Sequence, residues 1–250
     1  MNQTFHIASC SFGKDSLATI LVALEHGDPI DRAVFSEVMY DRHRDISGEN
    51  PEHIDFIRNT AIPKLASFGI PVDVVRAQRD FIDYFFQRHE RGNHVGMLHG
   101  FPIGGMCKIN SDCKVKPIRE YLREYRKRGN VVQYIGIAID EPKRLARLNG
   151  DKVSLLAKYN ITEKRAREIC EANGLLSPIY KSGTRGGCWF CPNQKICDFN
   201  RFRAQHPQLW DELKQLSRVP FLTSPCFKYD MTFDDVENKM NYEQSQLKLF

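Results

Sequence analysis

Short apolar runs alternate with helical patterns along the first two thirds of the chain. Four runs of apolar and β-branched residues are typical of buried strands, at residues 5–9, 32–38, 72–75 and 131–137. Predicted helices lie between and after these runs. The first is an apolar stretch that stops at Gly27, and the second runs from Asn50-Pro51 toward Phe68 with a kink at Pro63. A charged helix follows over 118–128, and Thr162 caps the last one. This order predicts an α/β fold, in which right-handed crossovers join the strands of a parallel sheet covered by helices.

The pattern changes near residue 180. Residues 181–250 are rich in glycine, cysteine, proline and aromatic residues and show no clear period. We therefore predict two parts, an α/β domain over residues 1–180 and a small cysteine-bearing C-terminal region over 181–250 that packs on it. With 250 residues, of which 42% are hydrophobic, the chain has enough apolar material for a sizeable core.

Charge and hydropathy narrow the choice of partners. The chain carries 36 basic and 31 acidic residues, a formal net charge of +5, which suits an anionic substrate or a nucleic acid without requiring either. The longest apolar run, residues 17–24, is far shorter than the roughly 20 residues that cross a membrane. The first residues show no basic segment followed by an apolar one. We expect a cytoplasmic protein without membrane contact, and the sequence leaves its oligomeric state open.

A turn of small and polar residues follows the first predicted strand, with the sequence Ser9-Cys10-Ser11-Phe12-Gly13-Lys14-Asp15-Ser16. Ligands of parallel sheets bind at the carboxyl ends of the strands, where a helix N-terminus offers unpaired N–H groups and a partial positive charge. Gly13 allows close approach of the backbone, and Lys14 adds positive charge. The two flanking serines can donate hydrogen bonds. The turn therefore suits a phosphate, although a tight turn with a capping serine would have the same residues.

The turn lacks the G-x4-G-K-[ST] pattern of a Walker A loop. It resembles the S-G-G-K-D-S loop of the PP-loop ATP pyrophosphatases, with Phe12 where the common form has glycine. The branch similar to phosphoadenosine phosphosulfate (PAPS) reductase accepts a bulky residue there. The resemblance implies an adenine nucleotide alpha hydrolase-like fold and binding of ATP with Mg²⁺, cleaved between its α- and β-phosphates. It also implies that Lys14 stabilises the departing pyrophosphate, that Asp15 orients the loop or binds Mg²⁺, and that the rest of the cradle is Ser11, Phe12, Gly13 and Ser16.

A second polar segment, Gly136-Ile137-Ala138-Ile139-Asp140-Glu141-Pro142-Lys143-Arg144, follows the fourth predicted strand. The same branch has a similar strand-end glycine, acidic pair and arginine. The resemblance implies that Gly136 lies at the nucleotide, that Asp140 and Glu141 lie near metal or ribose, and that Arg144 lies near phosphate and contributes to catalysis. A helix N-terminus with favourable acidic residues is the alternative interpretation. The segment Gly48–His53 resembles a family segment at the pocket rim and fits a helix cap equally well.

Cysteines form two pairs in the second half of the chain. In a reducing compartment, eight cysteines more often bind metal or do chemistry than form disulfides. Cys107 and Cys113 make one pair and Cys188 and Cys191 the other, and four thiolates suit tetrahedral zinc or an iron–sulfur cluster. Cys197 is a reserve ligand. The cysteines that stand alone, Cys10, Cys170 and Cys226, are interpreted as structural thiols.

The two cysteine pairs extend the family resemblance. The segment from Cys113 to Leu122 resembles the C…K-V-x-P-L segment of sulfonucleotide reductases, and Arg185-x-Gly187-Cys188-x-x-Cys191 resembles their later cysteine motif. The resemblance implies a [4Fe–4S] cluster, with zinc as the second choice, although the first pair is adjacent in the family and separated by five residues here. The C-terminal E-C-G-x-H motif of those reductases is missing from the sequence, and the neighbours of Cys226 do not match it.

These patterns give one leading hypothesis and two alternatives. The leading one is a PAPS-reductase-like PP-loop enzyme that adenylylates an acceptor, releases pyrophosphate and serves sulfur transfer. Its partners would be a nucleotide, a small-molecule or nucleic-acid acceptor, and a sulfur-donor or reductant protein. The alternatives are a sulfonucleotide (PAPS or adenylyl-sulfate) reductase, and a non-catalytic nucleotide sensor or zinc-bearing nucleic-acid binder. The glycine-containing stretch Gly92–Gly105 is expected to form a mobile loop over the site, and His89, His94 and His99 are expected on loops or the surface.

Overall fold

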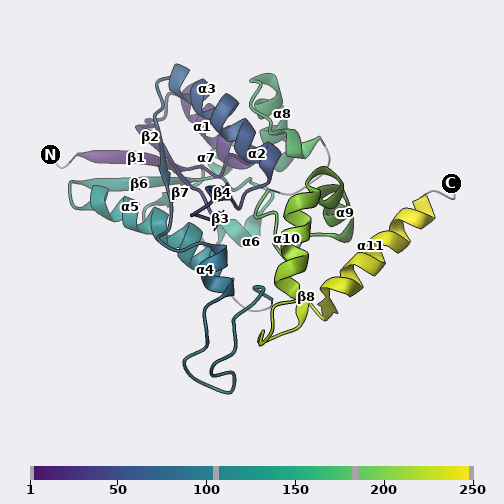
Figure 1. Cartoon of the computed structure of the whole chain (residues 1–250). Coiled ribbons are helices and arrows are strands. Elements are labelled where there is room, and N and C mark those ends of the chain that lie inside the picture. The colour runs from purple at the N-terminus through teal and green to yellow at the C-terminus, as the bar shows by residue number, and fades with distance from the viewer. Residues whose placement is uncertain (1–2, 104–106, 182–185, 248–250) are drawn as a thin grey trace. The chain divides into compact units, whose positions relative to one another are not determined.

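The computed structural model describes residues 3–103, 107–181 and 186–247, which group into two compact units (Figure 1). The first unit comprises Met1–Glu37, Asn50–Ala77 and Lys114–Gly186, and the second comprises Val38–Glu49, Gln78–Cys113 and Gly187–Phe250. The predicted boundary near residue 180 lies close to the last of these segments. The two earlier segments of the second unit were expected in the α/β domain. They join the second unit through aromatic packing between residues distant in sequence, which local periodicity does not reveal.

The first unit is built on a five-stranded parallel sheet, which confirms the predicted α/β class. Its strands are β1 (Thr4–Ser9), β2 (Arg32–Ser36), β5 (Val72–Val75), β6 (Asn130–Ile135) and β7 (Lys152–Val153). They are arranged in the order β5-β2-β1-β6-β7, and every neighbouring pair is parallel. The order of the strands along the chain therefore reverses between β1 and β6. In doubly wound sheets such a reversal marks the crevice in which ligands bind.

Helices cover both faces of this sheet (Figure 1). They are α1 (Lys14–His26), α2 (Pro51–Phe56), α3 (Ile62–Ser67), α5 (Lys116–Arg126), α7 (Leu155–Lys158) and α8 (Glu163–Ala172). The unit also contains α6 (Pro142–Leu145), which buries no side chain, and a short 3₁₀ turn at Pro178–Tyr180. The predicted kink near Pro63 takes the form of a π-helical turn over Ile57–Ala61, between α2 and α3. Because proline lacks an N–H, it cannot continue the regular helical ladder, and the wider turn accommodates it.

Alternation along the strands divides the core of the first unit into two layers. In β2, Ala33 and Phe35 belong to the large cluster that contains α1 and α8, whereas Val34 lies in the smaller cluster with Phe5 and Leu122 of α5. Successive side chains of a strand point to opposite faces, so these two clusters lie on the two faces of the sheet. At Gly27, α1 ends in the left-handed conformation (φ 67°), as its glycine stop predicts.

The second unit is rich in helices and aromatic packing. It contains two small antiparallel ladders, β3 (Met39–Asp41) with β4 (Ile46–Ser47) and β8 (Cys226–Lys228) with β9 (Met231–Thr232). Its helices are α4 (Phe81–Phe85), α9 (Ile196–Gln205), α10 (Pro207–Ser217) and α11 (Phe233–Leu247), and a π-helical turn, Ile109–Val115, leads from this unit into α5. Tyr40 packs on Phe81 and Trp189 with ring centroids 5.3 and 4.5 Å apart, which ties its three chain segments together.

Two sequence predictions fall partly outside the described residues. Arg185, the first residue of the later cysteine motif, lies there, as do the last residues of the stretch Gly92–Gly105. The described part of that stretch pairs with the residues before it as a hairpin, through bonds from His89 N–H to Met97 O and from His99 N–H to Gln87 O, both 2.9 Å. Among the described helices, none is both long and apolar enough to cross a bilayer.

Candidate functional site: a loop and carboxylate cluster at the end of β1

The predicted phosphate loop connects β1 to the N-terminus of α1 in the first unit. Gly13 is the N-cap of α1 in an extended conformation (φ −71°, ψ 160°), and no side chain of the described residues caps the helix there. The first-turn N–H groups therefore remain available to a ligand, apart from that of Lys14, which donates to the Tyr180 hydroxyl at 3.1 Å. A helix N-terminus of this kind combines free donors with the positive end of the helix dipole.

Phe12 explains how the loop tolerates a bulky residue where the resembling motif has glycine. Its φ of 57° lies in the left-handed region, which is unfavourable for a phenylalanine. Its side chain is fully buried and packs edge-on against Phe35 at a centroid distance of 5.3 Å. Burial of an aromatic ring contributes about 2 kcal/mol and offsets the backbone strain. Phe12 was expected at the nucleotide, but its ring faces the core, so only its backbone can contact a ligand.

A buried histidine holds the loop carbonyl in place. His53 of α2 is 2% exposed, and its Nε2 lies 3.2 Å from the carbonyl oxygen of Ser11. Its Nδ1 lies 2.8 Å from the hydroxyl oxygen of Ser177. Because a carbonyl only accepts, Nε2 carries the proton, and Nδ1 accepts from the serine hydroxyl. The segment Gly48–His53 thus contributes both a helix cap, at Asn50, and a contact to the loop. The family resemblance indicated this segment but did not indicate that His53 is the residue that contacts the loop.

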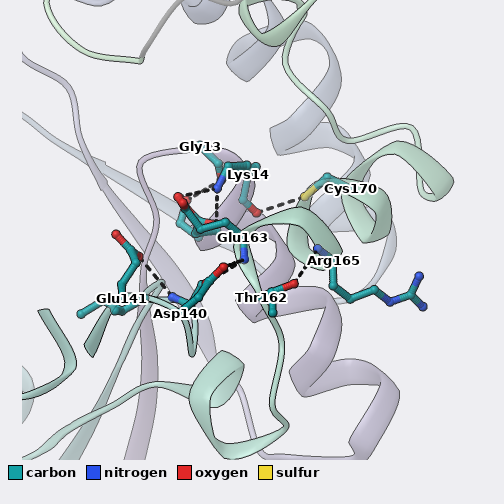
Figure 2. A network of polar contacts seen from close by, with 12 residues as sticks. Gly13, Lys14, Asp140, Glu141, Thr162, Glu163, Arg165 and Cys170 are labelled. Carbon is teal, nitrogen blue, oxygen red and sulfur yellow. Dashed lines mark hydrogen bonds and ion pairs between the residues drawn. The ribbon is translucent and has the colours of Figure 1, made fainter. Parts of the chain in front are cut away.

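Two carboxylates accept hydrogen bonds from the ammonium group of Lys14, and a third lies close to them (Figure 2). Lys14 Nζ lies 2.7 Å from Asp15 Oδ1 and 3.0 Å from Glu163 Oε1. One oxygen each of Asp15, Glu141 and Glu163 lies within 4.8 Å of the others, so the three could bind one metal ion. Glu163, the first residue of α8, was not expected at the site. Only the Thr162 cap in the sequence indicated that α8 begins there.

The pKa values of this cluster reflect burial and charge crowding. Burial raises the pKa of Asp15, the Lys14 ammonium opposes that effect, and the neighbouring Glu163 and Glu141 add to it. Burial alone would lower the pKa of Lys14, but its hydrogen bonds to Asp15 and Glu163 outweigh burial and raise it. The three acids, with Lys14 and Arg144 as their basic partners, leave an excess of one negative charge when all are ionised. Oxygen ligands with excess negative charge are the setting in which Mg²⁺ binds, usually together with the phosphates of a substrate.

The segment after β6 approaches this loop closely. A Cβ atom on Gly136 would lie 2.6 Å from the backbone nitrogen of Ser16 and 2.7 Å from the carbonyl carbon of Asp15, so glycine is required for packing there. The Asp140 carboxylate accepts from the N–H of Glu163 at 3.0 Å and so supports the start of α8 (Figure 2). Of the predicted acidic pair, Glu141 thus belongs to the carboxylate cluster, whereas Asp140 positions Glu163.

The remaining predicted residues are engaged within the protein. Arg144 donates to Glu141 at 2.5 Å from an exposed position, so in this structure its charge is paired with the cluster. The hydroxyl of Ser16 donates to the carbonyl oxygen of Gly13 at 3.0 Å, within the turn itself. Ser11 is exposed. Among the described residues, no hydrogen bond to its hydroxyl is found. The structure thus brings Gly13, Lys14, Asp15, Ser16, Gly136 and Glu141 together around the end of β1.

Two single cysteines support the same loop. Cys170 of α8 is fully buried, and its Sγ donates to the carbonyl oxygen of Lys14 at 3.1 Å. Burial raises its pKa to about 12. Cys10 is also buried, and burial raises its pKa to about 11. Both are therefore neutral thiols at physiological pH, as their interpretation as structural residues predicts, whereas Cys226 is half-buried.

The four cysteines predicted to bind metal all belong to the second unit. Burial raises the pKa of Cys113 to about 12, and the neighbouring Asp112, Asp80 and Cys107 contribute to the shift. Cys107, Cys188 and Cys191 are half-buried. The Cys188–Cys191 segment forms a turn in which the Cys191 N–H donates to Cys188 O at 3.1 Å.

Packing around α4 links the two pairs. The Cys113 thiol donates to the carbonyl oxygen of Arg79 at 3.4 Å. Two residues further on, Phe81 packs at a tilt on Phe190, which lies between Cys188 and Cys191, at a centroid distance of 4.2 Å. Tetrahedral zinc with bonds of about 2.3 Å would hold its sulfurs roughly 3.8 Å apart. No three of these four sulfurs lie within 4.8 Å of one another. That these cysteines bind a [4Fe–4S] cluster, or zinc, stays a prediction.

Known proteins similar to this chain come from the solved structures alone. No protein-family model matches this chain, and no curated protein sequence matches it. Among solved structures, the chain is similar to the phosphoadenylyl-sulfate (PAPS) reductase from Candida auris in its phosphate complex, with 13% identity, a TM-score of 0.44, and coverage of 76% of this chain and 82% of that one. It is also similar to the U34-tRNA thiolase NcsA from Methanococcus maripaludis with its [4Fe–4S] cluster, with 18% identity, a TM-score of 0.41, and coverage of 96% of this chain and 72% of that one.

Proposed function

We propose that the chain is an ATP-dependent enzyme that adenylylates an oxygen of an acceptor, releases pyrophosphate, and so prepares that oxygen for replacement by sulfur. One observation carries the proposal. A loop with free helix N–H groups, a lysine and three convergent carboxylates lies where the strand order of a parallel sheet reverses. Those are the groups that a triphosphate and its divalent cation require.

Each group then has a role in phosphoryl chemistry. The N–H groups of the first turn of α1 would hold the terminal phosphates. Asp15, Glu141 and Glu163 would hold Mg²⁺, which neutralises charge on the phosphates when it is bound. With the carboxylates so occupied, Lys14 would turn to the phosphates and stabilise the negative charge that develops on the departing pyrophosphate. Catalysis of this kind consists of positioning and charge stabilisation, and it does not require a nucleophilic side chain.

The overall reaction balances with a sulfur donor. The acceptor oxygen attacks the α-phosphorus of ATP, and the bond to the β-phosphate oxygen breaks, which gives an adenylylated acceptor and pyrophosphate. A hydrosulfide sulfur then forms a bond to the carbon that carries the adenylylated oxygen, and that oxygen leaves with AMP. A metal cluster on the four cysteines of the second unit, and a sulfur-donor protein, would supply or hold that sulfur.

The products of ATP cleavage test the proposal. Protein purified without oxygen is incubated with Mg²⁺, ATP, sulfide and a mixture of nucleosides and RNA, and phosphorus NMR identifies the products. We expect AMP and pyrophosphate in equal amounts, and none from the Lys14→Ala variant. ADP with orthophosphate, or undiminished turnover by Lys14→Ala, would contradict the proposal. Sulfite formation from a sulfonucleotide and a thiol would favour sulfonucleotide reduction instead.

A further inference from the structure

The hydroxyl of Tyr180 lies at the N-terminus of α1, within the first unit. It accepts the N–H of Lys14, the first residue of the helix, at 3.1 Å. Tyr180 ends the short 3₁₀ turn Pro178–Tyr180 and reaches the loop from 166 positions further along the chain. A Cβ atom on Gly13 would lie 3.1 Å from this hydroxyl oxygen, so the glycine leaves the room that the hydroxyl takes up. No spacing of residues in the sequence indicates this contact.

The turn that carries Tyr180 is held to the loop at a second point. The hydroxyl of Ser177, the N-cap of the turn, donates to Nδ1 of His53, whose Nε2 donates to the carbonyl oxygen of Ser11. Ile179, next to Tyr180, is 3% exposed. A hydrogen bond before Tyr180 and a buried side chain beside it thus fix the turn. The hydroxyl is therefore held in place before any ligand binds.

The proton of the Tyr180 hydroxyl is available to a ligand. A phenol can donate one hydrogen bond while it accepts another. Burial raises the pKa of Tyr180 more than the hydrogen bond from the Lys14 N–H lowers it, so the hydroxyl keeps its proton at physiological pH. Among residues 3–103, 107–181 and 186–247, no atom accepts this proton. The hydroxyl of Ser16, by contrast, donates within the turn.

A backbone donor lies next to this hydroxyl. The N–H of Asp15 follows that of Lys14 in the first turn of α1, and it donates to no atom of the described residues. Two neighbouring donors at the positive end of a helix dipole favour a group with several negatively charged oxygens. A phosphate presents such oxygens, whereas a neutral amide or hydroxyl group does not.

We propose that the Tyr180 hydroxyl is a phosphate ligand of the nucleotide site, which accepts the Lys14 N–H and donates to an oxygen of the terminal phosphates of ATP. The inference rests on the function proposed above, because it assigns a contact to the same triphosphate. A hydrogen bond to a charged oxygen is shorter and stronger than one between neutral groups. The fixed O–H group thus stabilises the negative charge that develops on the departing pyrophosphate.

Affinity for inorganic pyrophosphate tests this contact without knowledge of the acceptor. Full-length protein purified without oxygen is titrated with pyrophosphate and Mg²⁺ by calorimetry. Tyr180→Phe removes the donor, and the ring that remains still fills the space in front of the Lys14 N–H, so that group does not replace the lost donor. We expect this variant to bind pyrophosphate about tenfold more weakly than the wild type, which corresponds to about 1.4 kcal/mol.

Tyr159→Phe is the matched control, because it removes a hydroxyl at the opposite end of the same helix. The Tyr159 hydroxyl donates to Asp28 Oδ2 at 2.7 Å, two residues after α1 ends at His26. Its loss should leave pyrophosphate affinity within about twofold of the wild type, and thermal unfolding without ligand measures the effect of each variant on stability. If Tyr180→Phe loses stability but binds pyrophosphate as tightly as Tyr159→Phe, the hydroxyl only caps the helix and the inference is overturned.

Fluorine NMR gives a second test in which the hydroxyl stays in place. 3-Fluorotyrosine is incorporated at position 180 alone, or at position 159 alone as the control. Pyrophosphate should shift the fluorine resonance at position 180 and leave that at position 159 unchanged. A resonance at position 180 that saturating pyrophosphate does not move would contradict the contact.

The same samples separate this inference from the proposed function. Pyrophosphate binding that responds to Tyr180→Phe, together with cleavage of ATP to ADP and orthophosphate, would keep the phosphate contact and remove adenylylation. Pyrophosphate binding that responds to Lys14→Ala but not to Tyr180→Phe would remove this inference and leave the proposed function. A wild-type protein that binds neither pyrophosphate nor ATP would overturn both.

Discussion

Replacing Lys14 should change the affinities for a divalent cation and for ATP in opposite directions. In this structure the Lys14 ammonium donates to Asp15 and Glu163, two of the three carboxylates that could bind a metal ion. A divalent cation must compete with that ammonium group for the same oxygen atoms. Lys14→Met removes the competitor, so the metal alone should bind more tightly. The same change removes a positive charge from the phosphate loop, so ATP should bind more weakly.

The contacts of Lys14 set the size of the expected change. A hydrogen bond to a charged group contributes about 1.5–3 kcal/mol when buried. The Lys14 side chain is 16% exposed, but that of Glu163 is 50% exposed, and solvent screening reduces the second contact to below about 1 kcal/mol. A net contribution of about 1.4 kcal/mol corresponds to a tenfold change in affinity. We therefore expect Mn²⁺ to bind Lys14→Met about tenfold more tightly than the wild type.

Electron paramagnetic resonance of free Mn²⁺ measures this affinity directly, and calorimetry measures ATP affinity on the same samples. Lys164→Met is the matched control, because Lys164 is exposed beside Glu163 in the first turn of α8 and the change removes the same charge. It should leave Mn²⁺ affinity within about twofold of the wild type. If Lys14→Met binds Mn²⁺ no more tightly than Lys164→Met, the carboxylates do not form the metal site and the reasoning is refuted.

Three further outcomes follow from the structure. Gly136→Ala should lower the free energy of unfolding by about 3 kcal/mol in chemical denaturation, because its Cβ would lie 2.6 Å from the Ser16 nitrogen; an unchanged midpoint would contradict the close approach. Burial opposes ionisation of Glu237, but its bonds from Lys214 and Trp210 outweigh burial and lower its pKa below the usual 4.5. Glu237→Gln should therefore destabilise the protein by about 1 kcal/mol at pH 7, and the difference in thermal unfolding should shrink as pH falls below about 4.5; a difference that persists at pH 3 would count against this assignment. Anaerobically purified protein should show a broad charge-transfer band with about four irons per chain, absent from Cys188→Ser, and stoichiometric zinc in place of iron would argue against a cluster.

The sequence predicted the elements that depend on local pattern. The strand Val72–Val75 has the bounds that its apolar run indicated, and α1 ends at the glycine that the sequence marked as its stop. The phosphate loop was recognisable because its residues are contiguous. Asn50 and Pro51 also marked the start of α2 correctly, because a cap residue and a proline act on their own turn.

Residues that act across the fold were beyond the reach of local pattern. Glu163 reaches the loop from 149 positions away in the sequence, and Tyr180 from 166. The role of His53 depends on its contact with the Ser11 carbonyl, and no spacing of residues in the sequence indicates that contact. The two earlier segments of the second unit were not expected there for the same reason, since Phe81 and Phe190 meet only in the folded chain. Motifs identify the chemistry, and tertiary contacts decide which side chains take part in it.

A crystal structure with Mg²⁺ and α,β-methylene-ATP, an analogue that cannot be cleaved between its α- and β-phosphates, tests the central claim most directly. We expect oxygens of the β- and γ-phosphates within 3.2 Å of the N–H groups at the start of α1, as for ordinary hydrogen bonds. Mg²⁺ should contact an oxygen of Asp15 or Glu163, and the Lys14 ammonium should have moved from these carboxylates to the phosphates. Nucleotide bound elsewhere on the chain, with Lys14 still held by Asp15 and Glu163, would contradict the account.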